Sequence, residues 1–308
     1  MAINWYPGHM HKAQREIRKI LGEIDLFIEV LDARIPYSSE NPMIANIRGD
    51  KPCIKILNKS DLADPQITAD WLAHFKQTKN TDAIAVTAKT PSTLKDIIAL
   101  CKSMAPNRGE PGKPVRALIA GIPNVGKSTT INILANRIIA KTGNEPAVTK
   151  AQQRINIGDG VILYDTPGML WPKVENENSG YRLAITGAIK ETAFDLDDIA
   201  TYALDYLMQA YPEQLKARYQ LEALAENGYE TLELIGKKRG CLRAGGRVEM
   251  NKAAKIVLTE LRDMQIEAIS METPEMCIAE QDEVEARLAE KAQKQAERKK
   301  KFKQKRNG

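Results

Sequence analysis

The sequence of 308 residues is poor in the side chains that build metal and disulfide sites. It has only three histidines, and its four cysteines stand alone, without a CxxC pair or a nearby histidine. This spacing argues against a zinc site or a disulfide scaffold and favours reduced thiols, as in cytosolic proteins. The cysteines are Cys53, Cys101, Cys241 and Cys277.

Long apolar runs are also missing, and no stretch is long enough to cross a bilayer. The first residues lack the charged segment and apolar core of a secretory signal. We therefore expect a soluble, cytoplasmic protein without a membrane partner, and we expect it to be a monomer. The net charge is only +5, so basic residues matter through their clustering rather than through their total.

A phosphate-binding signature is present at residues 121–128, which read GIPNVGKS and match GxxxxGK[ST]. The apolar run Val115 to Ala120 precedes it, so a strand, a tight turn and a helix start are expected in that order. Lys127 would reach the terminal phosphates, and the Ser128 hydroxyl would bind Mg²⁺. A simple glycine-containing turn is the alternative. The residues expected to contact GTP here are Asn124, Val125, Gly126, Lys127, Ser128 and Thr129.

The run Asn58, Lys59, Ser60 and Asp61 follows the expected strand Cys53 to Leu57 and predicts the base that is bound. The Asp61 carboxylate can accept hydrogen bonds from the N1–H and 2-amino groups of guanine, and adenine lacks that pair. Asn58 would brace the loop, and the alkyl stem of Lys59 would cover the base. Without the phosphate signature, the same four residues would be an ordinary turn.

Three further elements complete a guanine-nucleotide site. Asp165 to Gly168 has the form DxxG, so Asp165 can hold Mg²⁺ through water and the Gly168 N–H can face the γ-phosphate. Thr149 lies in a polar stretch that could order around Mg²⁺ and the γ-phosphate, although such a threonine is commonly just solvated. Thr87 and Ala88, with Lys89, would support guanine through backbone N–H groups.

These elements occur in the order base loop, base support, phosphate loop, first switch and second switch, whereas an ordinary GTPase begins with the phosphate loop. With Asp32-Ala33-Arg34-Ile35-Pro36 and Trp5-Tyr6-Pro7-Gly8-His9-Met10, the sequence closely resembles the YlqF/RbgA family of circularly permuted GTPases up to about Arg247. It departs from the family at Ala147 and Lys150, and in its long basic tail. The resemblance implies late maturation of the large ribosomal subunit, with GTP, GDP and that subunit's precursor as partners.

The expected fold is α/β, with a permuted and mostly parallel sheet in residues 1–175, a helical domain in 176–272 and a charged tail in 273–308. Alternating strands and helices indicate the parallel sheet, and a hairpin at Ile155 to Tyr164 would form an antiparallel edge. The tail is expected to be disordered or a frayed helix when free. The residues expected to bind RNA are Lys237, Lys238, Arg239, Arg243, Lys299, Lys300 and Lys301, although a solvated basic face is the alternative.

The expected reaction is Mg²⁺-dependent hydrolysis of GTP, with Lys127, Thr149 and Gly168 acting on the phosphates. Met169 occupies the position where a glutamine would orient water, so another group must do so. His9 is one candidate, and an RNA or packing contact is the alternative for it. Asn124 could also ligate K⁺ beside the phosphates. Other readings are a GTPase for small-subunit assembly or RNA modification, and an RNA chaperone whose nucleotide pocket is mainly structural.

Overall fold

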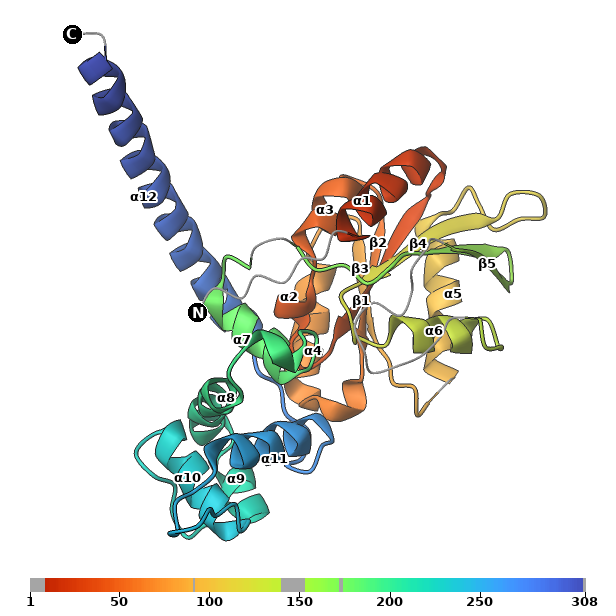
Figure 1. Cartoon of the computed structure of the whole chain (residues 1–308). Helices are drawn as coiled ribbons and strands as arrows, with labels where there is room; N and C mark the ends of the chain where they lie inside the picture. Colours follow the sequence, from red (N-terminus) through yellow and green to blue (C-terminus); the bar gives the residue numbers. More distant parts are fainter. Residues whose placement is uncertain (1–8, 91, 140–152, 172–173, 307–308) are drawn as a thin grey trace.

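The computed structural model describes residues 9–90, 92–139, 153–171 and 174–306, and it leaves out the side chains of residues 9–13, 92–95 and 299–306. An α/β domain and a smaller group of helices lie side by side, and a long C-terminal helix projects from their junction (Figure 1). Among the described residues, none of the helices combines the length and the hydrophobicity of a membrane span. The four cysteines are buried and free.

Six strands form one sheet in the order β3-β2-β1-β4-β6-β5. All neighbours are parallel except β5 and β6, which form the expected antiparallel hairpin through Asp159 and Gly160. Their positive φ angles of 48° and 75° suit the tight turn. The strands are β1 (Leu26–Asp32), β2 (Cys53–Asn58), β3 (Thr81–Ala85), β4 (Val115–Gly121), β5 (Gln153–Gly158) and β6 (Val161–Asp165). The predicted α/β sheet is confirmed.

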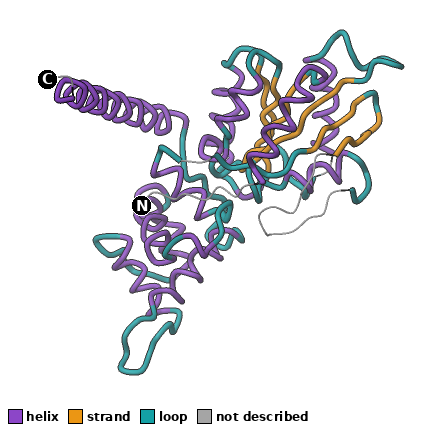
Figure 2. The backbone as a smooth tube through the Cα atoms, turned by 45° about the horizontal axis from the view of Figure 1, so that its top comes forward, coloured by secondary structure: helices purple, strands orange, loops and turns teal. Residues whose placement is uncertain are grey.

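Helices cover both faces of this sheet because successive strand residues point to opposite sides. Phe27 and Leu118 pack with Ile17 and Ile44 on one face, whereas Ile28 belongs to a cluster with the helices of the other face. Figure 2 shows the strands gathered in one part of the molecule. The helices of this domain are α1 (His9–Ile20), η1 (Leu21–Glu23), α2 (Pro36–Ser39), α3 (Pro42–Arg48), η2 (Ser60–Leu62), α4 (Pro65–Lys76), α5 (Ser92–Met104) and α6 (Lys127–Leu134).

The helical domain follows the second switch, and α8 is its central helix. Ile199, Ala203 and Leu207 of α8 are buried, as their helical spacing predicts. The helix α8 packs against both α10 and α11. The helices after the sheet are α7 (Glu177–Ile185), η3 (Glu191–Ala193), α8 (Leu196–Ala210), α9 (Pro212–Tyr219), α10 (Gly228–Lys238), α11 (Met250–Arg262) and α12 (Pro274–Arg306).

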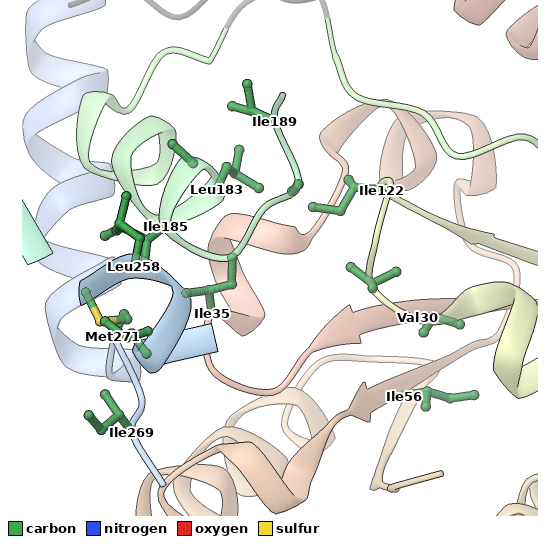
Figure 3. Close-up of a cluster of buried hydrophobic side chains, with 14 of the residues drawn as sticks. Val30, Ile35, Ile56, Ile122, Leu183, Ile185, Ile189, Leu258, Ile269 and Met271 are labelled. Carbon is green, nitrogen blue, oxygen red and sulfur yellow. The ribbon is translucent and has the colours of Figure 1, made fainter. Parts of the chain in front are cut away.

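The hydrophobic core runs without a break from the sheet into the helical domain. Figure 3 shows Val30 and Ile122 of the α/β domain in one cluster with Ile185, Leu258 and Ile269 of the helical part. The connection from α11 to α12 includes residues 269–272, which run along the α/β domain and which we call the strap. Within the strap, the Ile269 N–H donates to the Leu62 carbonyl at 3.0 Å. The two domains therefore pack against each other and are not joined by a linker alone.

The tail differs from the sequence expectation in its first turns. It forms one helix, α12, and Cys277 in that helix is buried against Trp71 and Phe75 of α4. Glu280 of α12 accepts hydrogen bonds from Arg182 of α7 at 2.9 and 2.6 Å. The beginning of the expected tail is thus part of the junction between the domains, because it supplies a buried thiol and a paired carboxylate. Contacts between residues so far apart in the chain leave no local sequence pattern.

Candidate nucleotide-binding site

The phosphate loop lies between β4 and α6, at the edge where the parallel strands end. A side chain on Gly121 would come within 2.7 Å of the Val30 carbonyl oxygen. Gly126 has a φ of +87°, and a side chain there would collide with the Asn58 amide. Both glycines are therefore required by backbone shape and close packing. The loop opens the α6 helix at Lys127, so its N-terminal N–H groups are available for a phosphate.

Lys127 and Asp165 meet at the centre of this edge. The Lys127 ammonium pairs with one oxygen of Asp165, and both side chains are buried. The other Asp165 oxygen has no hydrogen-bond partner among the described residues. Burial raises the pKa of the Asp165 carboxyl, and the attraction of Lys127 offsets part of that rise. A buried carboxylate oxygen without a hydrogen-bond partner is the kind of ligand that Mg²⁺ prefers, and Ser128 follows Lys127 in α6.

The base loop follows β2, which is separated from β4 by β1, and its side chains reach across to hold the phosphate loop. The Asn58 amide donates to the Val125 carbonyl at 2.7 Å, and the Lys59 ammonium donates to the Asn124 carbonyl at 2.7 Å. Lys59 adopts the left-handed conformation, with a φ of 60°. Two consecutive side chains thus fix the backbone of the phosphate loop, and this places the expected base and phosphate elements together.

The expected base-supporting loop lies beside Asp61. The Thr87 hydroxyl donates to one Asp61 oxygen at 2.7 Å, and the Lys89 ammonium lies 2.8 Å from the other. Partial burial acts to raise the pKa of the Asp61 carboxyl, but the hydrogen bonds from Lys89 and Thr87 outweigh it and lower the pKa. Asp61 is therefore ionised near neutral pH and can accept from a base. Ser60 adds a backbone link to Val86 at 3.1 Å, and Ala88 is exposed.

The second switch continues from β6 over the phosphate loop. Gly168 lies against Pro123, because a Cβ on Gly168 would come within 3.3 Å of the Pro123 backbone. Met169 is buried, and its N–H donates to the Gly121 carbonyl at 3.2 Å. Its carbonyl accepts from the Asn41 amide at 2.8 Å. The Met169 side chain packs into the core with residues of α1 and α3.

Two expected catalytic residues are not placed in detail. Thr149 lies outside the described residues, and His9 is the first residue of α1 but its side chain is not described. Asn124 is placed, and its amide nitrogen donates to the Gly187 carbonyl at 3.3 Å. The phosphate loop therefore touches the end of α7. The K⁺ site at Asn124 stays a prediction.

The basic residues expected to bind RNA differ in how free they are. Lys237 and Lys238 are exposed at the end of α10, and Lys237 pairs with Glu233 at 2.7 Å. Arg239 is engaged with Glu260 at 2.9 Å and lies over the Tyr219 ring. Arg243 is exposed and lies 3.5 Å from Glu249. Lys299, Lys300 and Lys301 belong to α12, and their side chains are not described.

Comparison with known proteins decides the family. The profile described as 50S ribosome-binding GTPase matches residues 116–232. The ribosome biogenesis GTPase A of Bacillus cereus is 47% identical over 282 residues, which cover 89% of this chain and 95% of the relative. The chain belongs to the ribosome biogenesis GTPase A family. The Priestia megaterium member is 46% identical, with 89% of this chain and 98% of the relative covered.

Solved structures of the family have the same fold. The GNP-bound crystal structure of YlqF from T. maritima has a TM-score of 0.60 at 27% identity, and the match covers 86% of this chain and 99% of that one. A GDP-bound structure of TM YlqF gives a TM-score of 0.61 at 26% identity, with 85% and 100% covered. This ribosome biogenesis GTPase A family member is therefore an enzyme of the GTPase class, as predicted. Mg²⁺ is the metal that such a domain typically requires.

One pair of residues at this edge had no role in the sequence expectation. Asp32, at the end of β1, accepts two hydrogen bonds from the Arg34 side chain and one from Lys59. Both residues stand in the motif that carries the family resemblance, but nothing in that motif says which partners they have. The available signal is position, because Asp32 ends the strand next to the one that carries Asn58.

Proposed function

We propose that this chain is a GTP-driven assembly factor for late maturation of the large ribosomal subunit, acting in the cytoplasm. The observation that carries the proposal is the direct connection between the second switch and the helical domain. Gly168 lies against the phosphate loop, and the chain reaches α7 within nine residues, at Glu177. A change at the γ-phosphate would thus act on the docking of the helices. The description of the matching profile, a 50S ribosome-binding GTPase, supports the choice of subunit.

In this proposal the residues of the site divide the work of binding and hydrolysis. Asp61 reads the guanine edge, Asn58 and Lys59 hold the base loop on the phosphate loop, and Lys127 leaves Asp165 to contact the terminal phosphates. Ser128 and Asp165 would hold Mg²⁺, which neutralises charge that develops on the phosphates during transfer. The phosphate-loop N–H groups orient the nucleotide at the start of α6.

The attacking water needs a positioning group from elsewhere. The described side chain after Gly168, Met169, is buried and apolar, so it cannot orient water. We propose that His9 does this once the ribosomal particle fixes the N-terminal segment, with Thr149 contacting Mg²⁺ and the γ-phosphate. This division predicts slow hydrolysis by the free protein and faster hydrolysis on the particle.

Helical-domain contacts with RNA complete the proposed cycle. The exposed cations near the end of α10 and along α12 would meet phosphates of the ribosomal RNA. Hydrolysis would then loosen the connection through the second switch and release the factor.

Turnover measurements with purified subunits test the proposal. GTP hydrolysis should rise at least about tenfold with precursors of the large subunit and stay near its intrinsic rate with small subunits. His9→Ala should keep GTP affinity and lose most of that stimulation. Equal stimulation by both subunits would favour a different ribosomal or RNA substrate, and a protein that binds GTP without turnover under any condition would be an RNA chaperone with a structural nucleotide pocket.

A further inference from the structure

A buried carboxylate lies directly beneath the base loop. Asp32 pairs in register with Asn58 across the parallel strands β1 and β2, and its side chain is only 3% exposed. It accepts hydrogen bonds from Nε and Nη2 of Arg34 at 2.9 and 2.8 Å, and from Nζ of Lys59 at 2.8 Å. One acidic group thus holds two cations, and the planar fork of Arg34 fixes its orientation.

Lys59 carries this arrangement to the phosphate loop. The same ammonium that meets Asp32 also donates to the Asn124 carbonyl at 2.7 Å. A lysine side chain has a flexible four-carbon stem, so an ammonium without a second partner would sample many positions. Asp32 restricts the Lys59 ammonium to the position from which it reaches the Asn124 carbonyl. Asn58 makes the only other described side-chain bond from the base loop to this stretch, at Val125.

Arg34 also contacts the strap. Its carbonyl accepts from the Met271 N–H of the strap at 2.8 Å. The side chain is 3% exposed and its second terminal nitrogen, Nη1, lacks a hydrogen-bond partner within the described part of the chain. Burying an arginine with one unpaired nitrogen costs free energy, and the ion pair with Asp32 chiefly offsets that cost. Neither side chain would therefore stay buried if the other were lost.

We infer that Asp32, oriented by Arg34, is a positioning residue for nucleotide binding, which holds Lys59 against the phosphate loop in the geometry that accepts guanine nucleotides. The inference rests on the proposed place of Lys59 in the guanine site. The Asp32–Arg34 pair would then affect nucleotide affinity as well as the stability of the folded protein. The effect passes through Lys59, and this makes the inference testable.

A double-mutant cycle tests it. Asp32→Asn and Lys59→Met should each weaken GDP binding by about tenfold or more, because each removes a charge-assisted hydrogen bond. In the Lys59→Met background, Asp32→Asn should change the affinity by less than about twofold, because its target is already gone. For GTP hydrolysis the variants should raise KM far more than they lower kcat. Partial unfolding would instead lower kcat through the active fraction.

Controls separate this outcome from general damage. Asp50→Asn makes the same substitution on the exposed surface and should match the parent. Thermal unfolding identifies variants that do not fold, and if Asp32→Asn is one of them, Arg34→Lys decides, since it keeps a cation beside Asp32 but loses the fork. Arg34→Lys should weaken GDP binding by roughly threefold, and not further in the Lys59→Met background.

If the effects of Asp32→Asn and Lys59→Met on GDP affinity are additive, the inference is overturned. It is also overturned if Lys59→Met weakens GDP binding while a folded Asp32→Asn protein keeps the parent's affinity. Parent-like affinity of Lys59→Met itself would remove Lys59 from the guanine site, and the inference would then fall together with that assignment.

Discussion

We predict that base selectivity depends on Asp61, because its carboxylate is ionised and partly accessible. Its side chain is 22% exposed and is already oriented by Thr87 and Lys89. Guanine offers two N–H groups to such a carboxylate. The sequence motif predicts this role by itself, since it gives the acid and its place after a strand, and the role stays a prediction.

Asp61→Asn should exchange guanine selectivity for xanthine selectivity. The loss of two hydrogen bonds to a charged acceptor should weaken GTP binding by roughly 2 to 4 kcal/mol, whereas xanthosine triphosphate offers a carbonyl to the new amide. Direct titration with both nucleotides measures the exchange. Asp70→Asn, on the outer side of α4, is the matched control. If the Asp61 variant keeps the parent's GTP affinity, Asp61 does not contact the base.

Asn124 links the phosphate loop to Gly187, and we predict that it also ligates K⁺. Its amide nitrogen donates to Gly187, so its amide oxygen is the group left for a cation. A K⁺ ion there would add positive charge beside the phosphates during transfer. We predict faster turnover in K⁺ than in Na⁺ at equal ionic strength, and loss of that preference in Asn124→Ala. Identical rates in the two salts, or an Asn124→Ala protein that keeps the preference, would contradict the prediction.

At the scale of elements, the strands were predictable and the junction was not. Apolar runs followed by Asn58, by Gly121 and by Asp165 identified the parallel strands within one or two residues, because a buried strand and a loop at its end have local signatures. Met264 shows the limit of periodicity. Its spacing from Ala253 and Val257 would continue their apolar face, but α11 ends at Arg262 and Met264 has a positive φ of 57°.

The strap and the first turns of α12 could not be read from the sequence for a different reason. Glu272 accepts from Ser38 at 3.0 Å, and the two residues are 234 positions apart. Such a pair depends on how the two domains pack together. The acids and arginines of this region look like ordinary surface charges in the sequence, and their burial depends on partners that no local pattern reveals.

Glu280 provides the test of this junction. It accepts from Arg182 at two nitrogens and from Asn176 and Asn178 at 2.8 and 2.9 Å. Glu280→Gln should destabilise the protein by about 2 to 3 kcal/mol at pH 7. The matched control is Glu283→Gln, on the exposed side of the same helix. Denaturant unfolding measures the difference.

The ion pair between Glu280 and Arg182 also predicts how the stability of the protein changes with pH. Burial acts to raise the pKa of the Glu280 carboxyl, but hydrogen bonds and the charge of Arg182 outweigh it and lower the pKa below its ordinary value of 4.5. The stabilisation is therefore complete above that value and is lost as the pH falls below it. The stability gap between the parent and Glu280→Gln should narrow as the pH falls below 4.5. A gap that stays constant or widens on acidification would show that the Glu280 charge does not stabilise the junction.

The basic end of α12 projects away from both domains of the molecule (Figure 1). Its first turns must be kept in any truncation, since Arg287 donates to the Glu175 carbonyl. A chain that ends after Glu290 keeps those contacts and removes nine lysines and arginines between Lys291 and Arg306.

Truncation after Glu290 should weaken RNA binding across sequences and reduce the slope of log affinity against log salt by several units. Intrinsic GTP hydrolysis should be unchanged, because the removed part lies outside every nucleotide element. Filter binding at several salt concentrations measures the slope. The parent's slope in the truncated protein would assign the phosphate contacts to the cations near Lys237 or to the α/β domain.

We propose that the nucleotide state controls attachment to one ribosomal particle through the connection from Gly168 to α7. Co-sedimentation with separated subunits in GTP, GDP or a non-hydrolysable analogue tests it most directly. The protein should pellet with the large subunit or its precursor in the analogue, dissociate in GDP, and stay in the supernatant with the small subunit. Attachment that is equal in all three nucleotides, or equal for both subunits, would contradict the account.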